Sequence, residues 1–189
     1  GTALALDGQH LELVALELDG APLAADRYQV DADRLTLLDP PAEFELATVT
    51  RIRPQDNAAL QGLYQSSGNF CTQCEAEGFR RITYFLDRPD VMAVFTTTLV
   101  ADKARYPVLL SNGNPVASGE MEDGRHWATW HDPFPKPSYL FAVVAGHLKY
   151  LEDRFVTRSG RTVTLRIYVE PDNIDQCDHA MYSLKQAMA

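Results

Sequence analysis

Residues 162–170, TVTLRIYVE, decide the class of fold. Apolar side chains occupy every second position, at Val163, Leu165, Ile167 and Val169, and more polar residues lie between them. Because successive side chains of an extended chain point to opposite faces, this alternation predicts a β-strand with one face in the core and the other polar.

Short β-prone runs fill most of the remaining chain. They are rich in β-branched and aromatic residues and span residues 11–18, 34–38, 44–52, 79–85, 91–101, 106–111, 126–130 and 139–145. Turn-forming dipeptides separate many runs, and we expect hairpins at most of them: Asp7-Gly8, Asp19-Gly20, Asn112-Gly113, Asp123-Gly124 and Ser159-Gly160. The chain is therefore predicted to be mainly β, as an antiparallel β-sandwich or a large curved sheet.

Residues 132–138, DPFPKPS, interrupt this pattern. Pro133, Pro135 and Pro137 lack the amide hydrogen that a central strand needs for pairing. We therefore expect an extended loop that leads into the apolar run at residues 139–145.

The last residues change to helical spacing. Apolar side chains recur at Ile174, Cys177, Met181, Leu184 and Met188. We expect Asp172 or Asn173 to cap the start of this short C-terminal helix. The helix has no C-cap glycine before the sequence stops, and residues 1–6 alternate like a strand already under way, so we expect a fragment of a longer protein.

Composition limits the partners. The 189 residues are 46% hydrophobic and carry a formal net charge of −9, with no block of lysine or arginine. This charge argues against nucleic acid or an anionic membrane surface as a partner. No stretch resembles a membrane-spanning helix or a secretion signal, so we expect a cytoplasmic protein in which Cys71, Cys74 and Cys177 are free thiols.

Cys71 and Cys74 form a Cys-x-x-Cys pair with three alternative roles. A structural zinc site needs four ligands, and no second pair completes one. A redox pair normally lies in a βαβ setting, which the hairpin pattern does not provide. We therefore favour packing of both side chains, with no metal bound.

The histidines and the common catalytic motifs give no active site. His10, His126, His131, His147 and His179 are scattered, and an interval of five places His126 and His131 on opposite faces of a strand. Structural or surface roles are expected for all five. Gly-x-Ser-x-Gly, phosphate-binding loops and His-Glu-x-x-His do not occur.

Polar side chains follow the cysteines. Gln73, Glu75 and Glu77 would lie on one side of an extended segment, where they could meet a ligand with a positive charge, such as a free α-amino group. The alternative is that both glutamates are ordinary solvated turn residues. The pattern alone leaves the two interpretations open.

Three long runs resemble the N-terminal domain of bacterial aminopeptidase N, in the zinc-dependent alanyl aminopeptidase family. They are GLYQSSGNFCTQCEAEGFRRITYFLDRPDVMAVFTTTLVADKARYPVLLSNGNPV (62–116), GRHWATWHDPFPKPSYLFAVVAGHL (124–148) and FVTRSGRTVTLRIYVEP (155–171). The resemblance is close from residue 62 to 188 and looser over the preceding strands.

The resemblance implies part of an enzyme that removes single residues from peptide N-termini. Residues 1–171 would form its saddle-like N-terminal β domain, and residues 172–189 would lead into a thermolysin-like catalytic domain. That domain carries Gly-Ala-Met-Glu-Asn and the zinc-binding His-Glu-x-x-His, which are missing here. Zinc is therefore expected only in the full-length enzyme, and this chain alone should be inactive.

The same resemblance assigns two substrate-binding residues. Glu75 matches the glutamate that binds the free α-amino group, and Gln73 matches the glutamine that lines the pocket for the first side chain. Glu77 receives no such role. The implied partners are a peptide N-terminus and the missing catalytic domain. The alternative is a free-standing β-sandwich module that binds peptide ends or a protein on the same scaffold.

Overall fold

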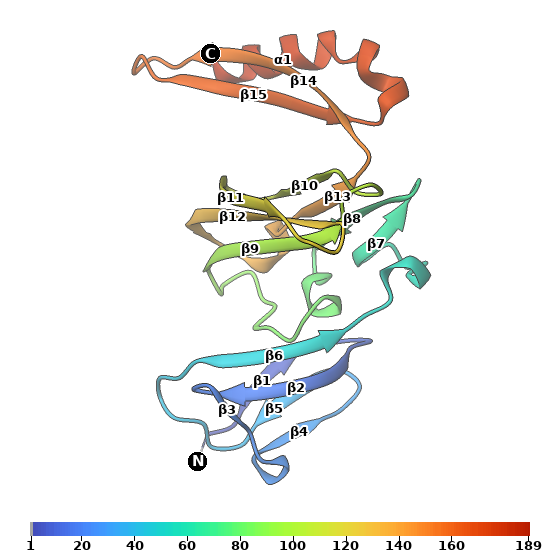
Figure 1. Cartoon of the computed structure of the whole chain (residues 1–189). Coiled ribbons are helices and arrows are strands. Elements are labelled where there is room, and N and C mark those ends of the chain that lie inside the picture. Colours follow the sequence, from blue (N-terminus) through green and yellow to red (C-terminus); the bar gives the residue numbers. More distant parts are fainter. Residues whose placement is uncertain (1) are drawn as a thin grey trace.

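The computed structural model describes residues 2–189 and consists of three layers (Figure 1). Gly1, the first residue of the predicted N-terminal strand, lies outside the described residues. Every strand pairing is antiparallel within the described range, and one α-helix lies near the C-terminus. The predicted mainly β fold class is thus confirmed.

The first layer is a small sandwich of two sheets. One contains β1 (Leu4–Asp7), β5 (Arg34–Leu37) and β4 (Tyr28–Val30), and the other contains β3 (Ala21–Pro22), β2 (Glu12–Leu18) and β6 (Leu46–Arg51). The 3-10 helix η1 (Ala25–Arg27) precedes β4. Leu6, Leu16, Leu35, Leu37 and Tyr84 form its buried core. Tyr84 comes from the second layer, so the core already joins the two.

The second layer also has two sheets. One has the order β10 (Val108–Ser111), β13 (Val143–Gly146), β8 (Asn69–Gln73) and β7 (Gly62–Ser66); the other has the order β11 (Asn114–Glu120), β12 (Arg125–Lys136) and β9 (Ala93–Asp102). The 3-10 helices η2 (Pro54–Asp56), η3 (Phe79–Arg81) and η4 (Ser138–Leu140) connect strands. Phe79, Phe85, Phe95 and Phe141 pack together with ring centroids 5.0 to 6.1 Å apart.

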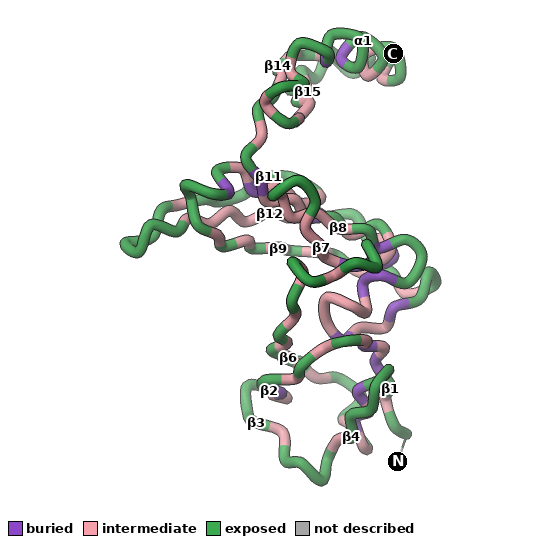
Figure 2. The backbone as a smooth tube through the Cα atoms, turned by 90° about the vertical axis from the view of Figure 1, so that its right-hand side faces the viewer, coloured by how far each residue is buried: buried purple, intermediate pink, exposed green. Residues whose placement is uncertain are grey.

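The third layer is a hairpin covered by the helix. It contains β14 (Lys149–Val156), β15 (Thr162–Val169), the 3-10 helix η5 (Pro171–Gln176) and α1 (Asp178–Met188). β15 is the strand predicted from TVTLRIYVE, with Leu165 buried on its apolar face. Figure 2 shows buried positions within the first layer and at its junction with the second, whereas the segment that leads into β14 has only exposed and intermediate positions after Gly146.

Three of the five turn dipeptides form hairpins, at Asp19-Gly20, Asp123-Gly124 and Ser159-Gly160. The other two connect strands of different sheets, because Asp7-Gly8 joins β1 to β2 and Asn112-Gly113 joins β10 to β11. A turn dipeptide reverses the chain locally, but the pairing partner depends on which strand edge lies nearby.

The strand predicted at residues 79–85 is wrong. Phe79–Arg81 forms η3, and only Phe85 makes an isolated bridge, to Asp7. The Phe79 ring is held among three other aromatic rings, and Arg80 turns toward a buried carboxylate, so tertiary contacts override the β propensity of this run. The run at 139–145 is also divided, into η4 and β13.

The prolines of DPFPKPS do not end the strand, contrary to the prediction of a loop. β12 continues to Lys136, and only Pro137 lies outside it. β11 reaches no further than the position opposite His131, so Pro133 and Pro135 lie where β12 has β9 as its only neighbour. The pairing with β9 is irregular between Asp132 and Lys136, which accommodates residues without an amide hydrogen.

The helix begins later than predicted. Residues 171–176 form η5, and α1 starts at Asp178 without a side-chain cap, so neither Asp172 nor Asn173 caps it. The Asn173 amide donates to the Glu170 carbonyl, an i to i+3 contact that keeps this turn in the 3-10 form. Among the described helices, none is both long and apolar enough to cross a membrane.

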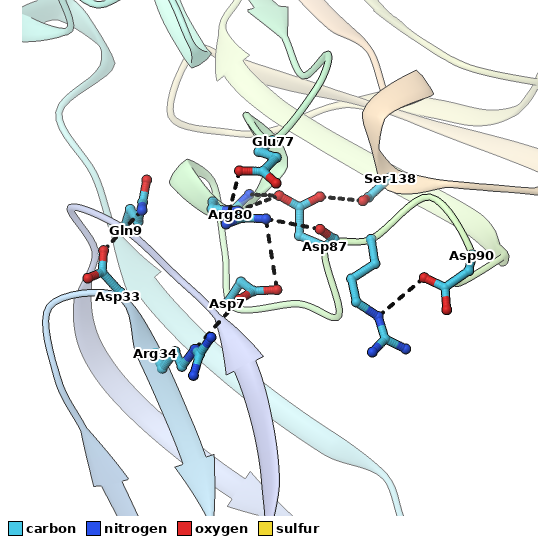
Figure 3. A network of polar contacts seen from close by, with 10 residues as sticks. Asp7, Gln9, Asp33, Arg34, Glu77, Arg80, Asp87, Asp90 and Ser138 are labelled. Atoms are coloured by element: carbon cyan, nitrogen blue, oxygen red, sulfur yellow. Dashed lines mark hydrogen bonds and ion pairs between the residues drawn. The ribbon is translucent and has the colours of Figure 1, made fainter.

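A buried ionic network ties the first layer to the second (Figure 3). The Arg80 Nε donates to Asp87 Oδ2 at 3.0 Å, the Arg80 amide donates to the same oxygen at 3.1 Å, and Ser138 Oγ donates to Asp87 Oδ1. Asp7 of β1 lies 4.0 Å from Arg80 Nη2. The Asp87 side chain is only 1% exposed, so its charge depends on these partners.

Asp87→Ala should destabilise the chain by about 3 kcal/mol or more, because it leaves the buried Arg80 guanidinium without its main partner. The free energy of unfolding in urea measures the effect. Asp90→Ala is the matched control, since it removes an acid from the exposed ion pair with Arg88 and should cost about 0–1 kcal/mol. Equal losses in both variants would contradict the assigned role.

Candidate functional site

The segment Cys74–Gly78 forms a tight turn directly after β8. The Gly78 amide donates to the Cys74 carbonyl at 2.8 Å, and η3 follows at once. Cys74 is buried, whereas Gln73 and Glu75 are exposed. The turn therefore buries the Cys74 side chain and leaves the polar side chains on either side of it in the sequence exposed.

Two glycines allow this turn to lie against β7. A Cβ atom on Gly78 would come within 2.3 Å of the Gln73 carbonyl oxygen and 2.9 Å of the Gly62 nitrogen. A Cβ on Gly62 would lie 2.9 Å from the Gly78 oxygen, and Gly62 also has a φ of +73°. Any larger residue at either position would push the turn away from the strand.

The side chains of Gln73 and Glu75 have different surroundings. The Gln73 side-chain amide donates to the main-chain oxygen of Glu75 at 3.3 Å, and the Glu75–Ala76 peptide bond is cis. Within residues 2–189, the Glu75 carboxylate has neither a hydrogen-bond nor an ion-pair partner. An exposed carboxylate on a turn with a fixed main chain is available to a cationic ligand.

Glu77 does not join Gln73 and Glu75. Its carboxylate lies 3.4 Å from Arg80 Nη1, so it belongs to the edge of the buried network. The expectation that Gln73, Glu75 and Glu77 lie on one side applied to an extended segment, and the chain instead turns after Gln73. This ion pair agrees with the structural or surface role expected for Glu77.

Burial suppresses the ionisation of Cys74. Desolvation, assisted by the nearby charge of Asp87, raises the pKa of Cys74 to about 12. All three cysteines are free, as predicted, with Cys74 and Cys177 buried and Cys71 half-buried. Across residues 2–189, no group of three or more His, Cys, Asp or Glu side chains could hold a metal ion.

Two histidines of β12 have structural partners. His126 Nε2 lies 2.7 Å from the Tyr106 carbonyl oxygen, and His131 Nδ1 lies 2.8 Å from Thr96 Oγ1. They are five residues apart in one strand and bond to different neighbours, in agreement with the roles predicted for them.

Residues 21–140 match the family described as the Peptidase M1 N-terminal domain. The chain belongs to this family. The resemblance found in the sequence is thereby confirmed, and the turn with Gln73 and Glu75 is part of an M1 N-terminal domain.

Known relatives extend well beyond this domain. Aminopeptidase N of Caulobacter vibrioides is 57% identical over 185 residues, which are 98% of this chain but 21% of that protein. The solved structure of Legionella pneumophila aminopeptidase A in complex with aspartic acid is 38% identical with a TM-score of 0.95, and the match covers 100% of this chain and 22% of that one. The M1 N-terminal domain thus spans about a fifth of the length of these relatives.

A more distant structure shares the fold. The M1 zinc metallopeptidase from Deinococcus radiodurans, solved with a Tyr-Ser-Ala substrate, is 20% identical with a TM-score of 0.75. The match covers 89% of this chain and 40% of that one. The layered β architecture therefore occurs in M1 domains with little sequence in common.

Sequence reasoning missed the residues that hold the turn in place. Arg80 and Asp87 are seven residues apart in a segment that is not an α-helix, and Ser138 lies 51 residues after Asp87, so no local pattern links the three. The sequence likewise does not indicate that the backbones of Gly62 and Gly78 lie in contact. The one available indication was a pair of consecutive arginines in an otherwise acidic chain.

Cys74 should react slowly with iodoacetamide in the folded M1 N-terminal domain. With a pKa of about 12, about one thiol in ten thousand is ionised at pH 8, and the rate should rise as the pH approaches 12. Mass spectrometry of labelled peptides measures this rate, with the chain in urea as the control. Labelling of Cys74 at pH 8 as fast as in urea would contradict the buried thiol.

Proposed function

We propose that this M1 N-terminal domain binds the free α-amino group of a peptide at Glu75, as the substrate-anchoring part of a zinc-dependent aminopeptidase. The complete enzyme would remove single residues from peptide N-termini. Support comes from relatives described as aminopeptidases, one of them a structure in complex with aspartic acid.

The observation that carries the proposal is the free, exposed carboxylate of Glu75 beside the paired carboxylate of Glu77. Both belong to one turn, but only Glu75 has its charge available. An ammonium group would bind it through charge-assisted hydrogen bonds. A fixed chain end also sets where the first peptide bond lies, which favours release of a single residue over internal cleavage.

Gln73 supports this geometry and is proposed to line the pocket for the first side chain. The Gln73 side-chain amide donates to the Glu75 main-chain carbonyl, so a shift of Gln73 would also displace the main chain that carries the Glu75 carboxylate. Gln73 therefore has two proposed roles, contact with the first residue of the peptide and positioning of Glu75.

The described residues do not fit a catalytic zinc ion, because no group of three or more ligands converges among residues 2–189. We propose that the zinc-binding residues lie in a catalytic domain of the same full-length chain, and that residues 172–189 lead into it. Bound zinc there would polarise the scissile carbonyl and activate water. The contribution of this domain would be to bind and orient the ammonium end of the peptide.

In the complete enzyme, Glu75→Ala should lower kcat/KM for alanyl p-nitroanilide by about ten- to 150-fold, the loss of about 1.5–3 kcal/mol of a hydrogen bond to a charged group. Glu77→Ala is the matched control from the same turn and should stay within about twofold of the parent enzyme, because its carboxylate faces Arg80. A loss below about twofold in Glu75→Ala would overturn the proposed anchor.

The 189-residue chain by itself should release no p-nitroaniline from alanyl p-nitroanilide, with or without added zinc. Its described residues lack a metal site, and its free thiol Cys74 is held in the unreactive neutral form. The measurement is an absorbance assay on the purified chain, with metal content determined in parallel. Zinc-dependent turnover that follows the chain through purification would show that a catalytic site lies within it.

A further inference from the structure

Two adjoining cavities lie on the side of η3 where Arg81 projects. The larger has a volume of about 690 Å³ and the smaller about 440 Å³, and His10, Leu11 and Arg81 line both. The Gln9 amide donates to the Arg80 carbonyl at 2.9 Å, which holds the loop before β2 against η3 and places His10 beside Arg81. The cavities therefore form where the first and second layers meet.

Arg81 differs from its neighbour Arg80. Arg80 has Asp87, Asp7 and Glu77 as partners, and these outweigh the effect of burial and raise the pKa of its guanidinium. Arg81 is half-buried, and within residues 2–189 its buried Nε has no acceptor and its guanidinium has no ion-pair partner. An unpaired buried donor on a charged group is costly unless a ligand completes it.

The other charges of the larger cavity already neutralise one another. Arg51 Nη1 lies 2.6 Å from Glu12 Oε1, and Arg53 Nε lies 2.6 Å from Asp56 Oδ2. Arg81 is the remaining arginine of that cavity, so it supplies one uncompensated positive charge in a chain whose net charge is −9. A single unit of positive charge matches a monoanion.

Apart from the charged side chains, His10 and Asn57, the wall of the larger cavity is apolar. Leu11, Ile52, Pro54, Ala58 and Leu63 line the larger cavity, which is of a size that holds small organic ligands. The smaller cavity is lined by Asp31 and Asp33, which would repel an anion. These features favour a ligand whose negative group meets Arg81 and whose apolar body lies in the larger cavity.

We propose that the cavity at Arg81 is a binding site for a monocarboxylate on an apolar body. The planar guanidinium suits a carboxylate, which can accept two parallel hydrogen bonds from it. The site is separate from the Glu75 anchor and does not depend on the proposed function. Two sources carry this chemistry: a small carboxylic acid, or an acidic residue between apolar ones in an extended peptide segment.

The test is a titration of the 15N-labelled chain with hexanoate, followed through the Arg Nε–H resonances at constant ionic strength. The Arg81 resonance, identified by its loss in Arg81→Gln, should shift saturably with hexanoate and not with hexanamide. Arg81→Gln should weaken hexanoate binding by at least about tenfold. Arg166→Gln is the matched control and should change it by less than about twofold, because Arg166 is paired with Glu152 and lines neither cavity.

The source is decided with blocked acetyl-Leu-Asp-Leu-amide and its Asn counterpart. Tighter binding of the Asp peptide than of hexanoate identifies a peptide segment, and the reverse order identifies a small acid. The proposal is overturned if neither probe shifts the Arg81 resonance at about 10 mM, or if hexanamide and the Asn peptide bind equally well. It is also overturned if Arg81→Gln binds hexanoate as tightly as the parent chain does.

Discussion

The contact on which the other layers depend is the buried pair of Arg80 and Asp87. It lies between the β1 strand of the first layer and the η4 turn of the second. Asp7 of β1 forms an ion pair with Arg80, and Ser138 of η4 donates a hydrogen bond to Asp87. An ion pair removed from water is stable only if its partners stay in position, so this network fixes the first sandwich relative to the aromatic cluster around Phe79. Packing alone could tolerate small rotations, but directional hydrogen bonds do not.

The same network positions the functional turn. Arg80 is the second residue of η3, and the turn that carries Glu75 lies between η3 and β8. Glu77 contacts Arg80 from within that turn, so the ionic network around Arg80 extends to a residue two positions after Glu75, the proposed binding residue. The candidate site thus consists of one exposed acid on a backbone that is held from both ends, by strand pairing and by a buried salt bridge.

Local patterns in the sequence predicted the strands that alternate or that contain β-branched runs, such as β15 and β9, because one face of each lies against other elements. They failed where long-range contacts decide the conformation. Phe79–Arg81 has strand-like composition yet forms a 3-10 helix, since its aromatic ring and its arginine have partners far away in the chain. The prediction of a loop around Pro133 was wrong for a related reason. Whether a strand position is central or at an edge depends on where the neighbouring strand ends.

For the site, the residues around CTQCEAEGF indicated carboxylate chemistry, and the family resemblance selected Glu75 over Glu77. Geometry then separated the two acids by their partners, which no spacing rule could do. Arg81 could not be singled out from the sequence, since a paired and an unpaired arginine look alike until the acids around them are located in space.

The close approach of Gly62 and Gly78 has a consequence for how such domains diversify. A Cβ at Gly78 would meet Gln73 O and Cys74 Cα as well as Gly62, and a Cβ at Gly62 would meet the Arg81 Cβ as well as Gly78, so neither position accepts even a methyl group unless the turn itself shifts. A loop insertion or a new side chain between them would be tolerated only where it projects away from β7. The main chain of the turn that carries Glu75 therefore stays in direct contact with β7 as long as both positions remain glycine.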